Sequence, residues 1–133
     1  MDIIVPHTIK KRELGGTISD EARKLFAEIK ERPEIAASIS SPRLPARTTL
    51  HKVYATTSGG PRRLLFFCRQ ASGTATSRIE RWVLLFYRDK SDRIGNNMSP
   101  KNPDFTQQLA KNLQAAMDDL ANSTPEHPRY DVL

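Results

Sequence analysis

The region from Thr49 to Arg93 constrains the fold most strongly, because it contains three short apolar runs separated by turn signals. The runs are Leu50–Ala55, Leu64–Cys68 and Trp82–Tyr87. Each is rich in β-branched, aromatic or leucine side chains, and the segments between them are rich in glycine, serine and threonine. Runs of this length and composition, bounded by turn residues, are typical of β-strands. The region therefore predicts three consecutive strands of an antiparallel meander.

Two further segments have the apolar spacing of amphipathic helices. The first follows Thr17 and Ser19, either of which can cap it, and the second begins at Asn102-Pro103-Asp104 and runs to about Asn122. Their recurring apolar positions are Ala22, Leu25, Phe26 and Ile29 in the first, and Phe105, Leu109, Leu113, Met117 and Leu120 in the second. Both helices are expected to pack one face against the sheet.

The order of these segments predicts an α+β fold. Asp2–Val5, an apolar run that stops at Pro6, is expected to form an edge strand of the same sheet. We therefore expect a small antiparallel sheet, mixed at its edge, of about four strands packed against N-terminal and C-terminal helices. One domain would span residues 1–122, and residues 123–133 would form a flexible C-terminal tail.

The sequence has no feature typical of a metal, cofactor or membrane protein. Cys68 is the only cysteine, so no disulfide can form within the chain, as is usual in reducing compartments. His7, His51 and His127 are far apart in sequence, and no glycine-rich phosphate loop occurs. We expect no signal peptide, because only a run of three apolar residues precedes Pro6, and no run approaches the ~20 apolar residues of a membrane helix. We expect a cytoplasmic protein without metal, cofactor or membrane partner.

Basic residues frame the three predicted strands. Residues 49–101 carry ten Lys or Arg against three acidic residues, and the whole chain has a net charge of +6. Together with the nearby aromatic residues, this excess suits a reaction on a phosphodiester, because Arg and Lys stabilise charge on phosphate and aromatic rings stack on exposed bases. The alternative is that these strand ends and loops are basic only because they are solvated.

Three of these segments resemble the strands of RelE/HigB-type toxins. Gly59–Phe67, with the sequence GGPRRLLFF, resembles their G-G-x-R-[IV]-[IV]-Y-Y strand. Leu50–Tyr54 is similar to the preceding [LY]-x-K-[IV]-R strand, and Leu84–Lys90 to the following L-L-x-Y-x-K strand. The first helix, from Ile18 to Glu34, resembles the L-S-D-E…L…N-P helix of HigB relatives. The similarity covers about residues 1–120.

The resemblance implies a RelE-like toxin domain over residues 1–122. Such toxins enter the ribosomal A site and cleave mRNA without a metal, and their partners are a cognate antitoxin protein, the ribosome and mRNA. The ribose 2′-hydroxyl attacks the adjacent phosphate, while protein groups transfer protons and stabilise the developing charge.

The family motifs also imply site residues. Arg63 matches the arginine that contacts the scissile phosphate, and Lys52 matches a basic residue of the preceding strand that acts as base or phosphate ligand. Either Arg88 or Lys90 takes the place of the basic residue after the last strand. The residues expected to bind RNA are Arg62, Tyr54, Tyr87, His51 and Arg93.

Two of these residues have more than one interpretation. Tyr54 stands where relatives often carry a second Lys or Arg, which removes a charge and offers a stacking ring. His51 is either a general base, since an unperturbed histidine titrates at about pH 6.5, or a histidine packed against a helix. Strand alternation puts His51 on the face opposite Lys52 and Tyr54.

Two other functions stay open at this point. A ParE-like protein would bind DNA gyrase without catalysis, and it would lack the basic cluster seen here. An RNA-binding module without activity would explain the missing second strand base and the missing counterpart of the late tyrosine that some relatives carry.

Overall fold

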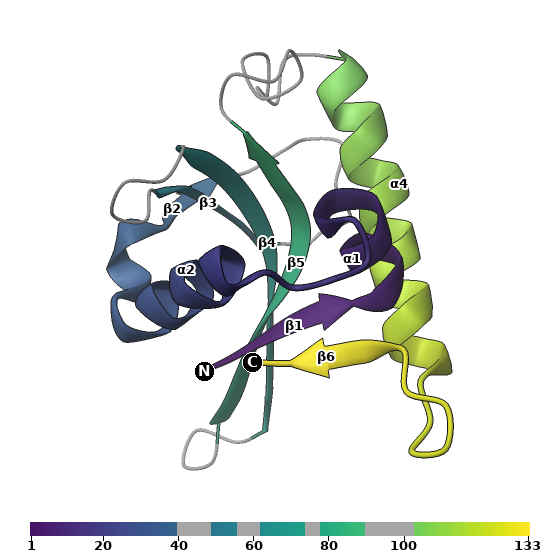
Figure 1. The fold of residues 1–133 in the computed structure, drawn as a ribbon. Coiled ribbons are helices and arrows are strands. Elements are labelled where there is room, and N and C mark those ends of the chain that lie inside the picture. Colours follow the sequence, from purple (N-terminus) through teal and green to yellow (C-terminus); the bar gives the residue numbers. More distant parts are fainter. Residues whose placement is uncertain (40–48, 56–61, 74–77, 90–102) are drawn as a thin grey trace.

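The computed structural model describes residues 1–39, 49–55, 62–73, 78–89 and 103–133 (Figure 1). They form an α+β fold in which a mixed sheet of six strands packs against helices. The elements in chain order are β1 Asp2–Pro6, α1 His7–Leu14, α2 Asp20–Glu31, the 3-10 helix η1 Pro33–Ile35, β2 Ala37–Ile39, β3 Thr49–Ala55, β4 Arg63–Gly73, β5 Arg78–Asp89, α4 Pro103–Asn122 and β6 Tyr130–Val132.

The predicted meander is confirmed. The sheet order is β2-β3-β4-β5-β1-β6, and β3, β4 and β5 are antiparallel neighbours. The strand count differs from the expected four, because β2 and β6 extend the sheet at its two ends.

β1 is an interior strand rather than the predicted edge strand. It runs parallel to β5, with Ile3 opposite Trp82, and its other side pairs with β6. Ile3, Ile4 and Val5 are all buried, so the strand is apolar on both faces. A continuous apolar run of this kind is typical of a strand that is covered on both sides.

The end of the chain differs from the predicted flexible tail. β6 pairs antiparallel with β1, and the backbone groups of Ile3 and Leu133 exchange two hydrogen bonds of 3.0 and 2.8 Å. Asp131 also binds the side chains of His7 and Lys10 on α1. A strand of three residues has almost no local sequence signal, and its partner strand lies at the other end of the chain.

Helices α2 and α4 cover opposite faces of the sheet. Consecutive residues of a strand point to opposite faces. Phe67 packs on Phe26 of α2, with ring centroids 6.5 Å apart, whereas its neighbour Phe66 packs on Phe105 of α4 at 5.1 Å. Within the described residues, no helix is long and apolar enough to cross a membrane.

Helix α2 follows the prediction closely. The side chain of Ser19 caps it by accepting the backbone N–H of Ala22 at 3.1 Å. The whole predicted apolar stripe, Ala22, Leu25, Phe26 and Ile29, is buried.

Helix α4 buries a polar residue within its apolar face. Phe105 and Leu109 of the predicted stripe are buried, but the stripe beyond them is only partly buried, and Asn112 is fully buried instead. Its Nδ2 donates a 2.8 Å hydrogen bond to the backbone oxygen of Leu85. Leu85 falls at the register shift in the β4–β5 pairing, where the ladder skips a residue. Asn112 therefore satisfies a backbone group in the irregular part of the sheet.

Helix α1 depends on a partner for its N-terminus. It follows Pro6 and has no side-chain cap of its own, but a carboxylate oxygen of Asp119 on α4 accepts the N–H of Thr8 at 2.8 Å. Its C-terminal end is followed by Gly15 and Gly16, whose φ angles are 68° and 91°. These left-handed conformations, which favour glycine, turn the chain back toward α2.

Candidate functional site

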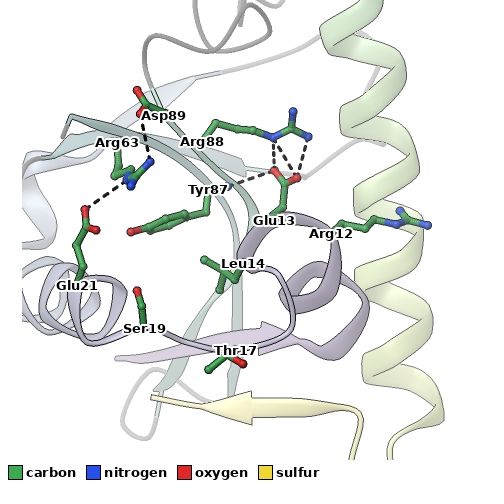
Figure 2. Close-up of a pocket in the computed structure, with 10 residues that line it drawn as sticks. All are labelled: Arg12, Glu13, Leu14, Thr17, Ser19, Glu21, Arg63, Tyr87, Arg88 and Asp89. Atoms are coloured by element: carbon green, nitrogen blue, oxygen red, sulfur yellow. Dashed lines mark hydrogen bonds and ion pairs between the residues drawn. The ribbon is translucent and has the colours of Figure 1, made fainter. Parts of the chain in front are cut away.

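A pocket of about 460 Å³ opens where the end of α1 and the start of α2 meet the ends of β4 and β5 (Figure 2). We call it the strand-end pocket. Among the described residues its charged lining is balanced, with three arginines and three carboxylates: Arg12, Arg63, Arg88, Glu13, Glu21 and Asp89. Tyr87 and Ser19 also line it.

Strand pairing and the α1–α2 turn bring these residues together. In the β4–β5 register Arg63 lies opposite Asp89, and Leu65 lies opposite Tyr87. Because residues opposite each other share a face of the sheet, Arg63, Tyr87 and Asp89 project on the α2 side. The glycine turn and the Ser19 cap then place Glu21, in the first turn of α2, against Arg63.

Arg63 is held between two carboxylates. Its Nε lies 3.3 Å from Oε1 of Glu21, and its Nη1 lies 3.5 Å from Oδ2 of Asp89. Its guanidinium carbon is 5.7 Å from the centroid of the Tyr87 ring. Burial opposes its charge, but the hydrogen bond to Glu21 and the neighbouring negative groups outweigh this effect and raise the pKa of Arg63. The side chain is therefore a fixed positive charge on the pocket wall.

Arg88 forms a closer and more buried ion pair. Two of its nitrogens, Nε and Nη2, donate to the carboxylate of Glu13, each at 2.8 Å, and the side chain of Glu13 is only 1% exposed. The same carboxylate accepts the backbone N–H of Tyr87 at 3.3 Å. This bidentate pair ties α1 to the end of β5 and so fixes the position of Tyr87.

Tyr87 places a buried hydroxyl in the pocket. The residue is 8% exposed, and its ring packs edge-on against Phe26 at 6.1 Å. In the described part of the chain its hydroxyl has no hydrogen-bond partner. Figure 2 shows the hydroxyl directed toward the side of the pocket where Glu21 and Ser19 lie. Burial, followed by the charge of Glu21, raises the pKa of Tyr87, and the nearby guanidinium of Arg63 offsets this only in part, so the phenol keeps its proton at neutral pH.

A second group of predicted site residues lies on the face of the sheet opposite Arg63. Lys52 Nζ and the guanidinium carbon of Arg62 lie 4.7 and 4.8 Å from the ring centroid of Tyr54. We call Lys52, Tyr54 and Arg62 the Tyr54 cluster. Lys52 pairs with Phe66, which faces α4, whereas Arg63 faces α2. The structure therefore does not bring Lys52 and Arg63 into one site.

His51 lies apart from both groups. Its ring stacks on Trp82 at 4.5 Å with an interplanar angle of 7°, and Nε2 has no hydrogen-bond partner among the described residues. Burial, followed by the charge of Arg69, lowers the pKa of His51. Of its two interpretations, the packed histidine agrees with this position, although the partner is a tryptophan of β5 rather than a helix. The predicted site residues Lys90 and Arg93 lie outside the described residues.

Sequence reasoning missed the carboxylates of the pocket. Glu21 is 42 positions from Arg63, and Glu13 is 75 positions from Arg88. No spacing motif links such pairs, and an acidic residue in the first turn of a helix is already explained by the helix dipole. Arg12 was also missed, but it turns away from the pocket and donates to Asn112 of α4 at 3.2 Å (Figure 2).

Within the described residues, no group of three or more His, Cys, Asp or Glu side chains is arranged to hold a metal ion. Comparisons of the chain with protein-family models, with curated proteins and with solved structures found no match. The function of the strand-end pocket must therefore be inferred from its own residues and their geometry.

Proposed function

We propose that the protein is a RelE-like toxin that cleaves mRNA on the ribosome through attack of a ribose 2′-hydroxyl on the adjacent phosphate. The observation that carries this proposal is the position of Arg63 and Tyr87 in one pocket. There a fixed positive charge lies beside a buried hydroxyl that has no hydrogen-bond partner among the described residues. Arg63 would stabilise the charge that develops on the phosphate, and such stabilisation is often the largest single contribution to catalysis.

Two other observations support the proposal. The order of elements, a strand and helices followed by an antiparallel meander and a C-terminal helix, agrees with the order expected for a RelE-like domain. The basic excess of residues 49–101 suits a partner as rich in phosphate as the ribosome and its mRNA. Arg88 has a positioning role in this scheme, because Glu13 binds both its guanidinium and the backbone of Tyr87.

A toxin of this kind requires a neutralising partner. We propose a cytoplasmic complex with a cognate antitoxin whose acidic or amphipathic segment covers the basic strands. Co-expression with the product of the neighbouring gene tests this part of the proposal. A stable complex that suppresses toxicity is expected, and toxicity unchanged by that product would contradict it.

RNA binding without cleavage is the second candidate, and a specific observation favours it. Arg63 and Arg88 are both engaged by carboxylates, whereas the ring of Tyr54 is 41% exposed with two cations beside it. An aromatic ring flanked by cations is a platform on which a base of a single strand can stack.

Induction in bacterial cells separates these functions. The wild type, Arg63→Ala and Arg63→Lys would be compared with Arg32→Ala, a control at an exposed arginine that directly follows α2. Growth and the 5′ ends of translated mRNAs would be followed. The proposal predicts growth arrest with new cuts in translated messages, both lost in Arg63→Ala and retained in the control. Arrest without cuts would favour gyrase inhibition, and absence of arrest would favour the binding module.

A further inference from the structure

The carboxylate of Glu21 lies beside Arg63, the residue that would bind the reacting phosphate. It comes from the first turn of α2, its side chain is 30% exposed, and it lines the strand-end pocket. Within the described residues its hydrogen bond to Arg63 uses Oε1, so Oε2 remains able to accept a proton there. The arginine that would bind the phosphate and the carboxylate that would take the proton are thus in direct contact.

Tyr87 supplies the complementary group. It is more than nine-tenths buried, yet its hydroxyl lacks a hydrogen-bond partner among the described residues. A buried hydroxyl without a partner is costly, and a catalytic role is one of the reasons for which proteins retain such a group. The edge-on contact with Phe26 and the Glu13–Tyr87 backbone bond hold the ring in this position.

We propose that Glu21 is the general base and Tyr87 the general acid of the cleavage inferred above, on which this assignment depends. Glu21 takes the proton of the ribose 2′-hydroxyl as the O2′–P bond forms. The P–O5′ bond breaks, and the leaving 5′ oxygen takes the phenolic proton of Tyr87. The products are a 2′,3′-cyclic phosphate and a 5′-hydroxyl end. Transfer of the proton from the acid form of Glu21 to the phenolate restores both residues.

The ion pair between Glu21 and Arg63 couples these events. The free pocket neutralises Arg63 with Glu21 and Asp89, so the arginine is held in place before RNA arrives. When Glu21 becomes protonated, its attraction for Arg63 falls, and the positive charge is available to the phosphate at the moment when negative charge develops there. The substrate class is RNA with a free 2′-hydroxyl, and a 2′-deoxyribose at the cleaved position would not react.

The test uses a short mRNA bound to the bacterial ribosome, with either an ordinary 5′ oxygen or a 5′ sulfur at the cleaved linkage. A thiolate leaves without protonation, so the sulfur substrate needs no general acid. Loss of a general acid or base costs about 100-fold or more in rate. Glu21→Gln is expected to slow both substrates by that factor. Tyr87→Phe is expected to slow only the oxygen substrate and to cleave the sulfur substrate at nearly the wild-type rate.

Matched controls are Glu31→Gln, on the exposed end of α2, and Tyr130→Phe in β6, both expected to cleave like the wild type. Glu21→Asp keeps a carboxylate and should retain part of the activity, which covers the case that Glu21→Gln unfolds. Wild-type rates in Glu21→Gln, or equal slowing of both substrates by Tyr87→Phe, would overturn the assignment while cleavage itself stands. Failure of the wild type to cut either substrate would overturn the proposed function and this assignment together.

Discussion

The strand-end pocket and the Tyr54 cluster both combine a tyrosine with basic side chains, but the basic side chains have different partners in the two places. In the pocket, Arg63 and Arg88 are fixed by carboxylates that come from helices and from β5. In the Tyr54 cluster, Lys52 and Arg62 lie over a partly exposed ring, on the face of the sheet opposite Arg63. Positions 62 and 63 are adjacent in sequence, and they project to different groups because a strand alternates its side chains. A basic sequence segment therefore defines two surfaces rather than one, and only one of them is preorganised.

The largest expected effect concerns the buried pair that makes the pocket rigid. Glu13→Ala would leave the guanidinium of Arg88 without its carboxylate at a site where the Glu13 side chain is almost completely buried. Breaking a buried pair in this way costs about 3 kcal/mol or more of the free energy of unfolding. Urea denaturation would measure it. Glu31→Ala, at an exposed position on α2, should change the free energy of unfolding by less than about 0.5 kcal/mol. If Glu13→Ala lowered the free energy of unfolding as little as the control does, the strand-end pocket would not be more rigidly held than the Tyr54 cluster.

The second expected effect compares cleavage by variants of the two groups. Arg63→Ala should lower the rate of cleavage of ribosome-bound mRNA about 100-fold, because it removes the charge that stabilises the reacting phosphate. Lys52 lies on the other face of the sheet, so Lys52→Ala should mainly weaken RNA binding. The cleavage rate at saturating RNA should change by about threefold or less. Single-turnover kinetics would separate rate from binding. Equal losses of rate in the two variants would mean that RNA reaches both faces during the reaction.

The Tyr54 cluster is expected to contribute affinity. Stacking of a base on an aromatic side chain is worth about 1–3 kcal/mol, so Tyr54→Ala should weaken the binding of single-stranded RNA by about tenfold. Tyr54→Phe should bind like the wild type, since the ring and its two neighbouring cations remain. Fluorescence anisotropy with a short labelled RNA would measure both. Equal weakening by Phe and Ala would show that the hydroxyl, rather than the ring, makes the contact.

The sequence could predict those parts of the molecule that depend on neighbouring residues, but not those that depend on distant ones. The meander and the buried stripe of α2 were predictable because their signals are local: short apolar runs, a serine cap and a helical repeat. The pairing of β6 with β1 joins the two ends of the chain, and no local pattern predicts it, although the continuous apolar run of β1 is typical of a strand covered on both faces.

Local sequence patterns could not predict the buried polar residues either, because their partners are also distant in sequence. Asn112 and Asp119 interrupt the apolar face of α4. Each forms a hydrogen bond with a backbone group, at Leu85 and at Thr8, that comes within reach only when the chain folds. In the site, the motif resemblance pointed to Arg63, and Tyr87 was named among the RNA-binding residues. Glu13 and Glu21 were missed because their partners lie far away in sequence.

The smallest expected effect concerns a partly exposed ion pair. Its contribution to the free energy of unfolding can be compared with that of the buried Glu13–Arg88 pair. Asp131 in β6 binds Lys10 at 2.7 Å and His7 at 3.1 Å. Burial favours its neutral form, but the hydrogen bonds from Lys10 and His7 and their charges outweigh this and lower the pKa of Asp131. A carboxyl whose pKa is lower in the folded than in the unfolded state stabilises the protein above the unfolded pKa, about 4, and this contribution is lost as the pH falls through the folded pKa.

Asp131→Asn should therefore lower the free energy of unfolding at pH 7 by about 1 kcal/mol or less, since solvent screens the pair. The difference from the wild type should shrink as the pH falls below about 4 and then through the lower pKa of the folded state, where the wild-type carboxyl also becomes neutral. Thermal melts from pH 2 to 7 would follow it, with Asp118→Asn, exposed on α4, melted alongside as the control. A difference that stays constant with pH would mean that Asp131 stabilises β6 through hydrogen-bond geometry alone. Stabilisation by charge would then be found only for the buried Glu13–Arg88 pair of these two ion pairs.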